Sequence, residues 1–452
     1  MKRFQNKRAY PLITASLLAV LLAALAGCGG GGGGGDSTPP PPPPKSGDRV
    51  WAQTVDPSAA YNETIYGVAV SSSAVYAVGV DADTTLGDWE WRMEKRHLDS
   101  GSLDTTFGTN GVVVLNSSAT TSVSDDVAFA AAIDSTYMYV VGYDSVPSDT
   151  DSEWHIEKRL LSTGATITTV RSNPSPGFDD AYAIAIDSNY MYVAGYDSAG
   201  AGGSSEWRIE LRSLSTGSLV SFGTVTSDPG AQDDVATTIA IDSTSMYVGG
   251  YETNSGSIWQ WRVEKRSLLT GATVTAFGPL NDGVLSYPTS TALDAVVTGI
   301  AVDATSLYIV GYVTDISGNV AWKIEKRNKT TGALDTTFNA AGTVPGVIVS
   351  DPNPVGADYA DAIAIDATSM YVAGSDELPD TTWEWRVEKR DLATGLLVTS
   401  FGTNGVYTSH PSAAVGLDDE AFTIAVDASY IYVGGYDMVP GTAEWRIEKI
   451  LK

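Results

Sequence analysis

Cysteine and histidine are scarce in this chain, which has one Cys and three His among 452 residues. A single thiol excludes a disulfide-stapled scaffold and any Cys-rich zinc or haem site. Basic residues are also few, with 27 Lys and Arg against 54 Asp and Glu, so the formal net charge is −27. This acidic balance argues against nucleic acid as a partner, because its binding needs a basic footprint.

Catalytic signatures are missing as well. The sequence contains no His-Glu-x-x-His, Gly-x-Ser-x-Gly, Walker A or Cys-x-x-Cys motif. The three histidines are dispersed: His97 follows a predicted strand, His155 replaces an Arg of a repeated motif, and His410 lies in a connection. A metal site or triad built on His is therefore not expected. Acidic residues are abundant, so glycosidase or lyase chemistry by paired carboxylates remains the alternative to a non-catalytic protein.

The N-terminus predicts export and lipidation. A basic start precedes an apolar stretch from Leu12 to Leu25, which is too short to span a membrane comfortably and has signal-peptide flanks. It ends in Leu-Ala-Gly-Cys28, which resembles a bacterial lipobox and contains the single Cys of the chain. We expect a signal peptide over 1–27 and lipidation of Cys28; the alternative is ordinary secretion with an incidental Cys.

A tether follows the lipidated Cys. Residues 29–35 are all Gly, and residues 39–44 are all Pro, a flexible segment followed by a stiff polyproline II spacer. We expect residues 28–48 to hold the folded part away from the membrane, in the bacterial envelope, at the outer membrane or cell surface. Without residues 1–27 the chain keeps 23 basic and 54 acidic side chains, a net charge of −31. Anionic headgroups repel such a body, so the lipid must supply the membrane attachment.

The remainder of the chain is a repeat. A Trp-Arg-Ile-Glu-Lys-like motif recurs seven times at spacings of 53 to 63 residues. The sequence of each unit predicts four strands. Strand a is small and apolar, strand b is rich in Tyr and Val and ends at Gly, strand c contains the Trp motif, and strand d varies. An Asp-containing turn joins strands a and b. Strand a should suit a crowded axis. Trp and Ile of strand c should pack between units, with Arg and Glu of its other face pairing across that boundary. The motif begins at Trp91, Trp154, Trp207, Trp261, Trp322, Trp385 and Trp445.

Seven four-stranded units predict an all-β, seven-bladed β-propeller over residues 49–452. The last unit ends after strand c, at Lys452, whereas an additional strand, residues 50–54, precedes the first unit. We expect this N-terminal strand to complete the last blade and close the ring. The alternative is an open β-solenoid.

A family resemblance supports this interpretation. Leu103-Asp-Thr-Thr-Phe-Gly-Thr-Asn-Gly111 is similar to the signature of the bacterial delta-sixty repeat, and residues 334–338 and 401–405 each repeat half of it. The resemblance covers about residues 60 to 452 and weakens in units two to four. It implies a propeller of a bacterial surface or secreted protein and implies no catalytic residue.

The candidate binding face contains the b–c and d–a connections. The b–c loops vary in length and sequence, and variable loops on a rigid scaffold often bind ligands. Asp residues recur at the d–a entries, where calcium, a cation that favours oxygen ligands, is the candidate ion; the alternative is that these residues only cap the loop entering strand a. The candidate metal residues are Asp125, Asp126, Asp179, Asp180, Asp233, Asp234, Asp294, Asp361, Asp418 and Asp419, and Asp358 lies beside them.

These features favour a lipid-anchored, non-catalytic binding or scaffold protein, which presents acidic loops to a protein or a polysaccharide, with Ca²⁺ as the candidate ligand ion. The near identity of the units supports this interpretation, because an enzyme usually needs one or two units that depart from the pattern. A carbohydrate-active hydrolase or lyase that uses acidic residues on the same face is the alternative.

Overall fold

The computed structural model describes residues 43–57, 61–82, 87–116, 125–145, 151–199, 203–230, 232–286, 294–354, 356–413, 416–439 and 441–452. The predicted signal peptide, Cys28 and most of the tether lie outside these residues. No helix in these ranges is long and apolar enough to cross a membrane.

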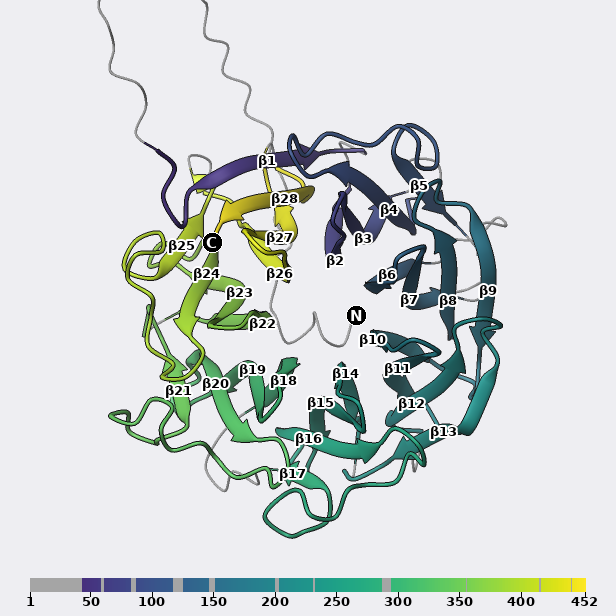
Figure 1. The fold of residues 1–452 in the computed structure, drawn as a ribbon, viewed down its shortest axis with the longest axis vertical. Coiled ribbons are helices and arrows are strands. Elements are labelled where there is room, and N and C mark those ends of the chain that lie inside the picture. Colours follow the sequence, from purple (N-terminus) through teal and green to yellow (C-terminus); the bar gives the residue numbers. More distant parts are fainter. Residues whose placement is uncertain are drawn as a thin grey trace, which may run out of the picture. The chain divides into compact units, whose positions relative to one another are not determined.

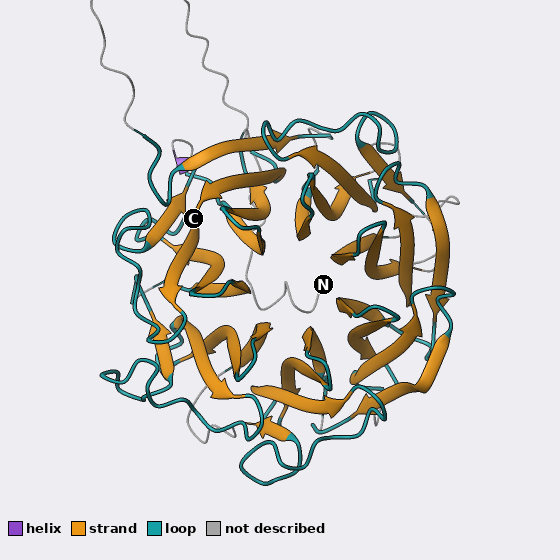
Figure 2. Cartoon of the chain, in the orientation of Figure 1, coloured by secondary structure: helices purple, strands orange, loops and turns teal. Residues whose placement is uncertain are grey.

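Residues 44–452 form a ring of seven four-stranded antiparallel sheets (Figures 1 and 2). The predicted all-β, seven-bladed propeller is confirmed. Each sheet runs outward from the axis in the order a, b, c, d, and each innermost strand contacts the innermost strands of both neighbouring blades, including β2 with β26. The ring is therefore closed, and an open solenoid is excluded.

The strands of blades 1 to 3 follow the repeat. Blade 1 contains β2 (Thr64–Val70), β3 (Ala74–Ala82), β4 (Trp89–His97) and β5 (Val112–Leu115). Blade 2 contains β6 (Asp126–Ile133), β7 (Tyr137–Ser145), β8 (Ser152–Leu160) and β9 (Thr166–Ser172). Blade 3 contains β10 (Asp180–Ile186), β11 (Tyr190–Asp197), β12 (Glu206–Ser213) and β13 (Leu219–Ser227).

Blades 4 to 6 have the same order. Blade 4 contains β14 (Val235–Ile241), β15 (Ser245–Thr253), β16 (Trp259–Ser267) and β17 (Val284–Ser286). Blade 5 contains β18 (Ala295–Val302), β19 (Ser306–Thr314), β20 (Val320–Asn328) and β21 (Val347–Ser350). Blade 6 contains β22 (Asp358–Ile365), β23 (Ser369–Glu377), β24 (Trp383–Asp391) and β25 (Val406–Ser409).

Blade 7 joins the two ends of the chain, as predicted. Its strands are β26 (Glu420–Val426), β27 (Tyr430–Asp437), β28 (Glu444–Leu451) and, as strand d, β1 (Arg49–Val55). β1 also supplies a charge that β28 lacks. Ile450 stands where the other strands c have Arg, and Arg49 opposite it contacts Glu448 at 3.3 Å.

The turn between strands a and b forms around Asp, as the sequence predicts. In blade 2, Asp134 Oδ1 accepts hydrogen bonds from the backbone N of Thr136 and Tyr137, and Oδ2 accepts one from the Tyr139 hydroxyl. Burial opposes ionisation of Asp134, but these hydrogen bonds lower its pKa below the usual value.

Strand b does not end at its Gly, which corrects the prediction. In blade 2, Gly142 lies inside β7, three residues before its end. A Cβ at Gly142 would overlap the Val127 carbonyl oxygen of the neighbouring strand a. Glycine is therefore required by close backbone approach within the sheet and not by chain reversal.

All seven motif Trp side chains are buried between blades, as predicted. The Trp207 indole Nε1 donates to the Tyr251 carbonyl of the next blade at 2.9 Å, and four other Trp residues make the equivalent bond. Trp261 and Trp322 have buried Nε1 atoms without a hydrogen-bond partner.

The Arg and Glu of strand c pair within their own blade, contrary to the expectation that they pair across the boundary. Arg262 and Arg266 both bind Glu264 between them. The boundary is crossed instead by stacking: the Arg262 guanidinium lies 5.7 Å from the Trp207 ring of the preceding blade. Equivalent stacks join all seven boundaries, with His155 over Trp91 and Lys323 over Trp261 in place of Arg.

Candidate functional site

The b–c and d–a connections meet on one face of the ring. Asp418, at the entry to blade 7, accepts a hydrogen bond from the backbone N of Trp383, which begins strand c of blade 6, at 3.2 Å. The side chains of Asp125, Asp233, Asp294 and Asn62 bond the preceding blade in the same way. These Asp and Asn side chains therefore cap strand c of the preceding blade, and not only their own loop.

The acidic dipeptides do not occupy one register. Pairing with strand b aligns Asp126 with Asp179 and with Asp234, so Asp125 and Asp180 fall at different positions. Asp126 is fully buried, and five other blades also have a fully buried acidic residue at its position. Blade 5 has Ala295 there instead. Those five residues are Glu63, Asp179, Asp234, Asp358 and Asp419.

We call Glu63, Asp126, Asp179, Asp234, Asp358 and Asp419 the buried acidic ring. Burial raises the pKa of Glu63, Asp179, Asp234, Asp358 and Asp419. The pKa rises to about 9 for Glu63, about 8 for Asp358, and about 7 for Asp179 and Asp234. Backbone donors partly offset the burial: the backbone N of Thr253 and of Gly230 donate to Asp234 at 2.7 and 2.8 Å. The ring therefore changes its charge near neutral pH.

The predicted metal residues are distributed along the entries and are not gathered in one cluster. Among the described residues, no group of three or more His, Cys, Asp or Glu side chains has the arrangement of a metal site. Asp361 lies inside strand a of blade 6, at the position of a β-bulge. Calcium binding at these residues stays a prediction.

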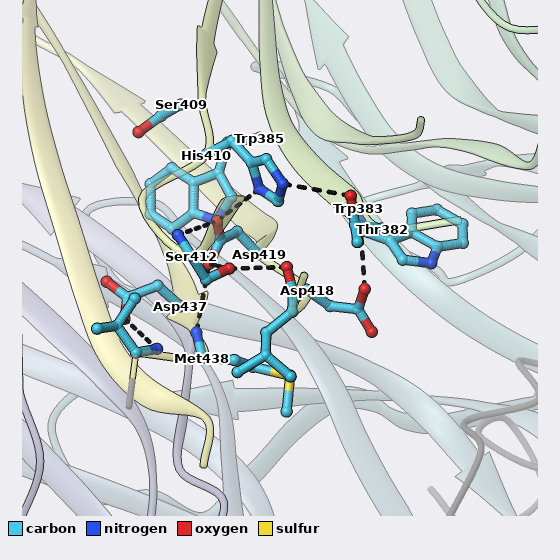
Figure 3. Close-up of polar contacts among 12 residues, drawn as sticks. Thr382, Trp383, Trp385, Ser409, His410, Ser412, Asp418, Asp419, Asp437 and Met438 are labelled. Carbon is cyan, nitrogen blue, oxygen red and sulfur yellow. Dashed lines mark hydrogen bonds and ion pairs between the residues drawn. The ribbon is translucent and has the colours of Figure 1, made fainter. Parts of the chain in front are cut away.

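One entry departs from the others by including a histidine (Figure 3). His410 Nδ1 lies 2.8 Å from Asp419 Oδ2, and Nε2 lies 3.3 Å from Thr382 Oγ1 in the b–c loop of blade 6. Ser412 Oγ donates to Asp419 Oδ1 at 2.8 Å. Blades 6 and 7 are thus joined by a hydroxyl, an imidazole and a carboxylate, a combination that the dispersed histidines of the sequence did not predict.

The Thr382 hydroxyl is not arranged as an activated nucleophile. The hydroxyl donates to Asp380 Oδ1 at 2.7 Å, which is nearer than His410 Nε2 at 3.3 Å. Thr382 is also buried. Burial, followed by the charge of Glu420, raises the pKa of the neighbouring Asp418 to about 6.

Sequence reasoning missed one asymmetric feature of strand a. Each strand a has a β-bulge, and the bulged residue differs among blades. It is aromatic in blades 7, 1, 2 and 3 and polar in blades 4, 5 and 6, although the sequence suggested small residues near the axis. The residues are Phe422, Tyr66, Phe129, Tyr182, Thr237, Thr298 and Asp361. In blades 2 and 7 the aromatic residue lies four places after the entry residues Asp125 and Asp418, a spacing that could have indicated it.

Comparisons with known proteins give similarity of fold. No family model matches the chain, and no curated protein matches it. Chaetomium thermophilum Sqt1 is 10% identical, with a TM-score of 0.44, over 87% of this chain and 96% of that one. The β-propeller domain of the Trilobed protease from Pyrococcus furiosus is 9% identical, with a TM-score of 0.41, over 86% and 94%. A GH43 endo-arabinanase from Bacillus licheniformis is 12% identical, with a TM-score of 0.30, over 59% and 92%. Similarity at this level says nothing about ligand or activity.

Proposed function

We propose that this protein is a bacterial envelope lipoprotein that works as a non-catalytic binding scaffold. Cys28 carries the lipid, residues 28–48 form the tether, and the delta-sixty-like propeller presents its b–c and d–a loops to a protein or a polysaccharide. The observation that supports this proposal is the use of the repeated charged residues. The Arg, Glu and Trp side chains of strand c make buried contacts that hold the blades together. The residues that differ among the blades lie in the loops on one face of this ring, where ligands often bind.

Membrane attachment is tested with Cys28→Ser in the full chain. We expect this variant to leave the membrane fraction, because the acidic propeller offers no attraction to anionic headgroups. Gly29→Ser is the matched control and should stay membrane-bound. Retention of Cys28→Ser in the membrane would contradict the lipoprotein proposal.

Ligand binding is tested on two levels. A glycan array and a pull-down with envelope proteins identify the partner, with loop-swapped blades as controls. Calcium binding at the d–a entries should raise the Tm when Ca²⁺ is added and lower it with a chelator, because an ion that binds only the folded state stabilises it. No shift in either direction would contradict the calcium proposal.

A carbohydrate-active hydrolase or lyase is the second candidate. The cluster of His410 and Asp419, beside the Asp418 carboxyl of raised pKa, favours it, because one blade boundary there departs from the repeat. A screen of polysaccharide substrates tests this candidate. Asp418→Asn should abolish any activity, whereas Asp233→Asn, the equivalent change in blade 4, should leave it unchanged.

A further inference from the structure

The N-terminal tether joins the propeller on the face of the a–b and c–d connections. Gly47 stands where the other blades have the Gly of the turn after strand c. Its backbone N donates to the Leu451 carbonyl at 2.7 Å, as that of Gly395 does to the Asp391 carbonyl at 2.8 Å, and both glycines have positive φ angles, 89° and 77°. Residues 44–48 therefore replace the turn that leads into strand d, and the chain enters on this face, beside β25 (Figure 1).

The c–d connections of neighbouring blades are joined in series on the same face. One backbone hydrogen bond links each connection to the turn of the next blade. From blade 4 to blade 7 the donors and acceptors are Gly278 and Thr331 at 3.1 Å, Asn339 and Thr394 at 2.8 Å, and Gly402 and Ser46 at 3.0 Å. An unbroken row of connections thus leads from blade 4 to the residues where the tether enters.

Large apolar side chains are exposed along this row, in three consecutive blades. Their exposed fractions run from 50% to 79%, and we call them the apolar tips: Leu269, Leu280, Val344 and Leu396. At the position of Leu269, two residues before the Gly of the turn, blades 1 to 3 have Asp99, Ser162 and Ser215. Single exposed apolar residues are normal on a protein, but a row of them in adjacent blades marks an interaction surface.

Charge separates the two faces of the ring. By sequence, the b–c and d–a connections contain many Asp residues and no Lys or Arg. On the face of the apolar tips, Lys side chains neutralise Asp: Lys95 pairs with Asp104 at 2.8 Å and Lys326 with Asp335 at 3.1 Å. Lys45 adds an exposed cation where the tether enters. Anionic headgroups therefore repel the b–c and d–a face more strongly than the face of the apolar tips.

Exposed apolar side chains also occur on the b–c and d–a face, but they are dispersed. They lie in connections next to blades 1, 3, 5 and 7: Tyr61, Phe178, Ile316 and Val439. These residues could approach a bilayer only together with the unneutralised Asp residues of the same connections. Position of the tether, apolar exposure and charge thus favour the same face for contact with lipid.

We infer that the apolar tips form a membrane-contact surface, which rests on a phospholipid bilayer beside the tether and turns the b–c and d–a connections away from it. This inference deepens the proposed function and rests on the lipoprotein proposal, because the lipid on Cys28 brings the propeller to the bilayer. The tips enter the interfacial region and orient the propeller, whereas the lipid holds it there.

Quenching of a fluorescent probe by a nitroxide lipid tests the inference on the full-length chain, purified from bacterial membranes and reconstituted in phosphatidylcholine vesicles. The probe is attached to Leu280→Cys or, as the matched control, to Ile316→Cys, which replaces an equally exposed apolar residue of the opposite face. Lipidation converts the Cys28 sulfur to a thioether, so the introduced Cys is the single thiol. We expect quenching about threefold stronger in Leu280→Cys, because only the apolar tips enter the interface.

The outcomes separate the surface from the lipoprotein proposal. Equal quenching in the two variants, or stronger quenching in Ile316→Cys, would overturn the surface while the lipoprotein proposal stands. Uptake of the probe by Cys28 of the wild-type chain would refute the lipoprotein proposal, and the surface with it. A probe on Leu280→Cys that is shielded from water but unquenched would place the tips against another protein and overturn the inference.

Removal of other tips sharpens the result. In the Leu280→Cys background, Leu269→Ser combined with Leu396→Ser should lower the quenching about twofold, because less apolar surface enters the interface. Both side chains are exposed, so the fold should be retained. Val439→Ser, which removes an exposed apolar side chain of the opposite face, is the matched control and should leave the quenching unchanged. Unchanged quenching in the folded double variant would overturn the inference.

Discussion

The blade boundaries and the axis follow different rules. The same contacts recur at all seven boundaries between blades. A cationic or imidazole side chain stacks on a buried Trp of the neighbouring blade, and a Glu of its own strand binds this side chain. At the axis the bulged residue varies from Phe to Asp in one position. The comparison teaches that side chains fixed by packing between blades recur in every blade, whereas the bulged position of strand a accepts aromatic, hydroxyl and acidic residues.

The largest expected effect lies at the boundaries. Glu264→Ala should lower the free energy of unfolding by about 3–5 kcal/mol, because it leaves Arg262 and Arg266 buried without their shared carboxylate. Urea unfolding measures this loss. Phe422→Leu, at the axis, is the comparison and should cost about 1 kcal/mol, since a half-buried side chain is replaced by another apolar one. Equal costs would remove the distinction between the two regions.

The pH dependence of stability depends on the buried acidic ring. The pKa values of Asp179 and Asp234, about 7, and of Asp358, about 8, exceed the usual value near 3.9 for Asp. At pH values between the unfolded-state pKa and the folded-state pKa, each of these carboxyls keeps its proton in the folded state and loses it in the unfolded state. The free energy of unfolding should therefore fall as pH rises from about 4 to 8, by up to about 1.4 kcal/mol per pH unit for each group.

Two variants separate this effect from other titrations. Asp234→Asn should reduce the slope of unfolding free energy between pH 5 and 8, measured by urea unfolding at each pH. The pKa of Asp427 shifts the opposite way, since burial is outweighed there by hydrogen bonds, and its contribution is constant above pH 5. Asp427→Asn should therefore lower stability equally at pH 5 and 8. A slope unchanged by Asp234→Asn would contradict the assignment.

The smallest expected difference in unfolding free energy is between substitutions at two blade boundaries. The Trp207 Nε1 donates a hydrogen bond to the next blade, and the Trp261 Nε1 has no partner. Trp207→Phe should therefore cost about 1 kcal/mol more than Trp261→Phe in urea unfolding, because only Trp207→Phe leaves a buried carbonyl without its donor. Equal costs would show that packing alone sets the energy of the boundary.

Much of the fold follows from the sequence by itself. The recurring Trp motif predicts the number of blades, and the missing and additional strands at the two ends predict that β1 closes blade 7. The Asp turn between strands a and b is also local, because its donors lie two and three residues further along the chain. Such features depend on spacing and short-range hydrogen bonds, which the sequence contains directly.

Tertiary structure alone decided the remainder, because partners far apart in the sequence or displaced by a bulge set it. Arg262 stacks on Trp207 of another blade, 55 residues away, and no local pattern distinguishes this contact from pairing across the boundary. Asp179 and Asp180 look like Asp125 and Asp126 but take a different register against strand b. Phe422, Tyr66, Phe129 and Tyr182 contact one another in turn across blade boundaries, because the innermost strands of neighbouring blades approach each other there.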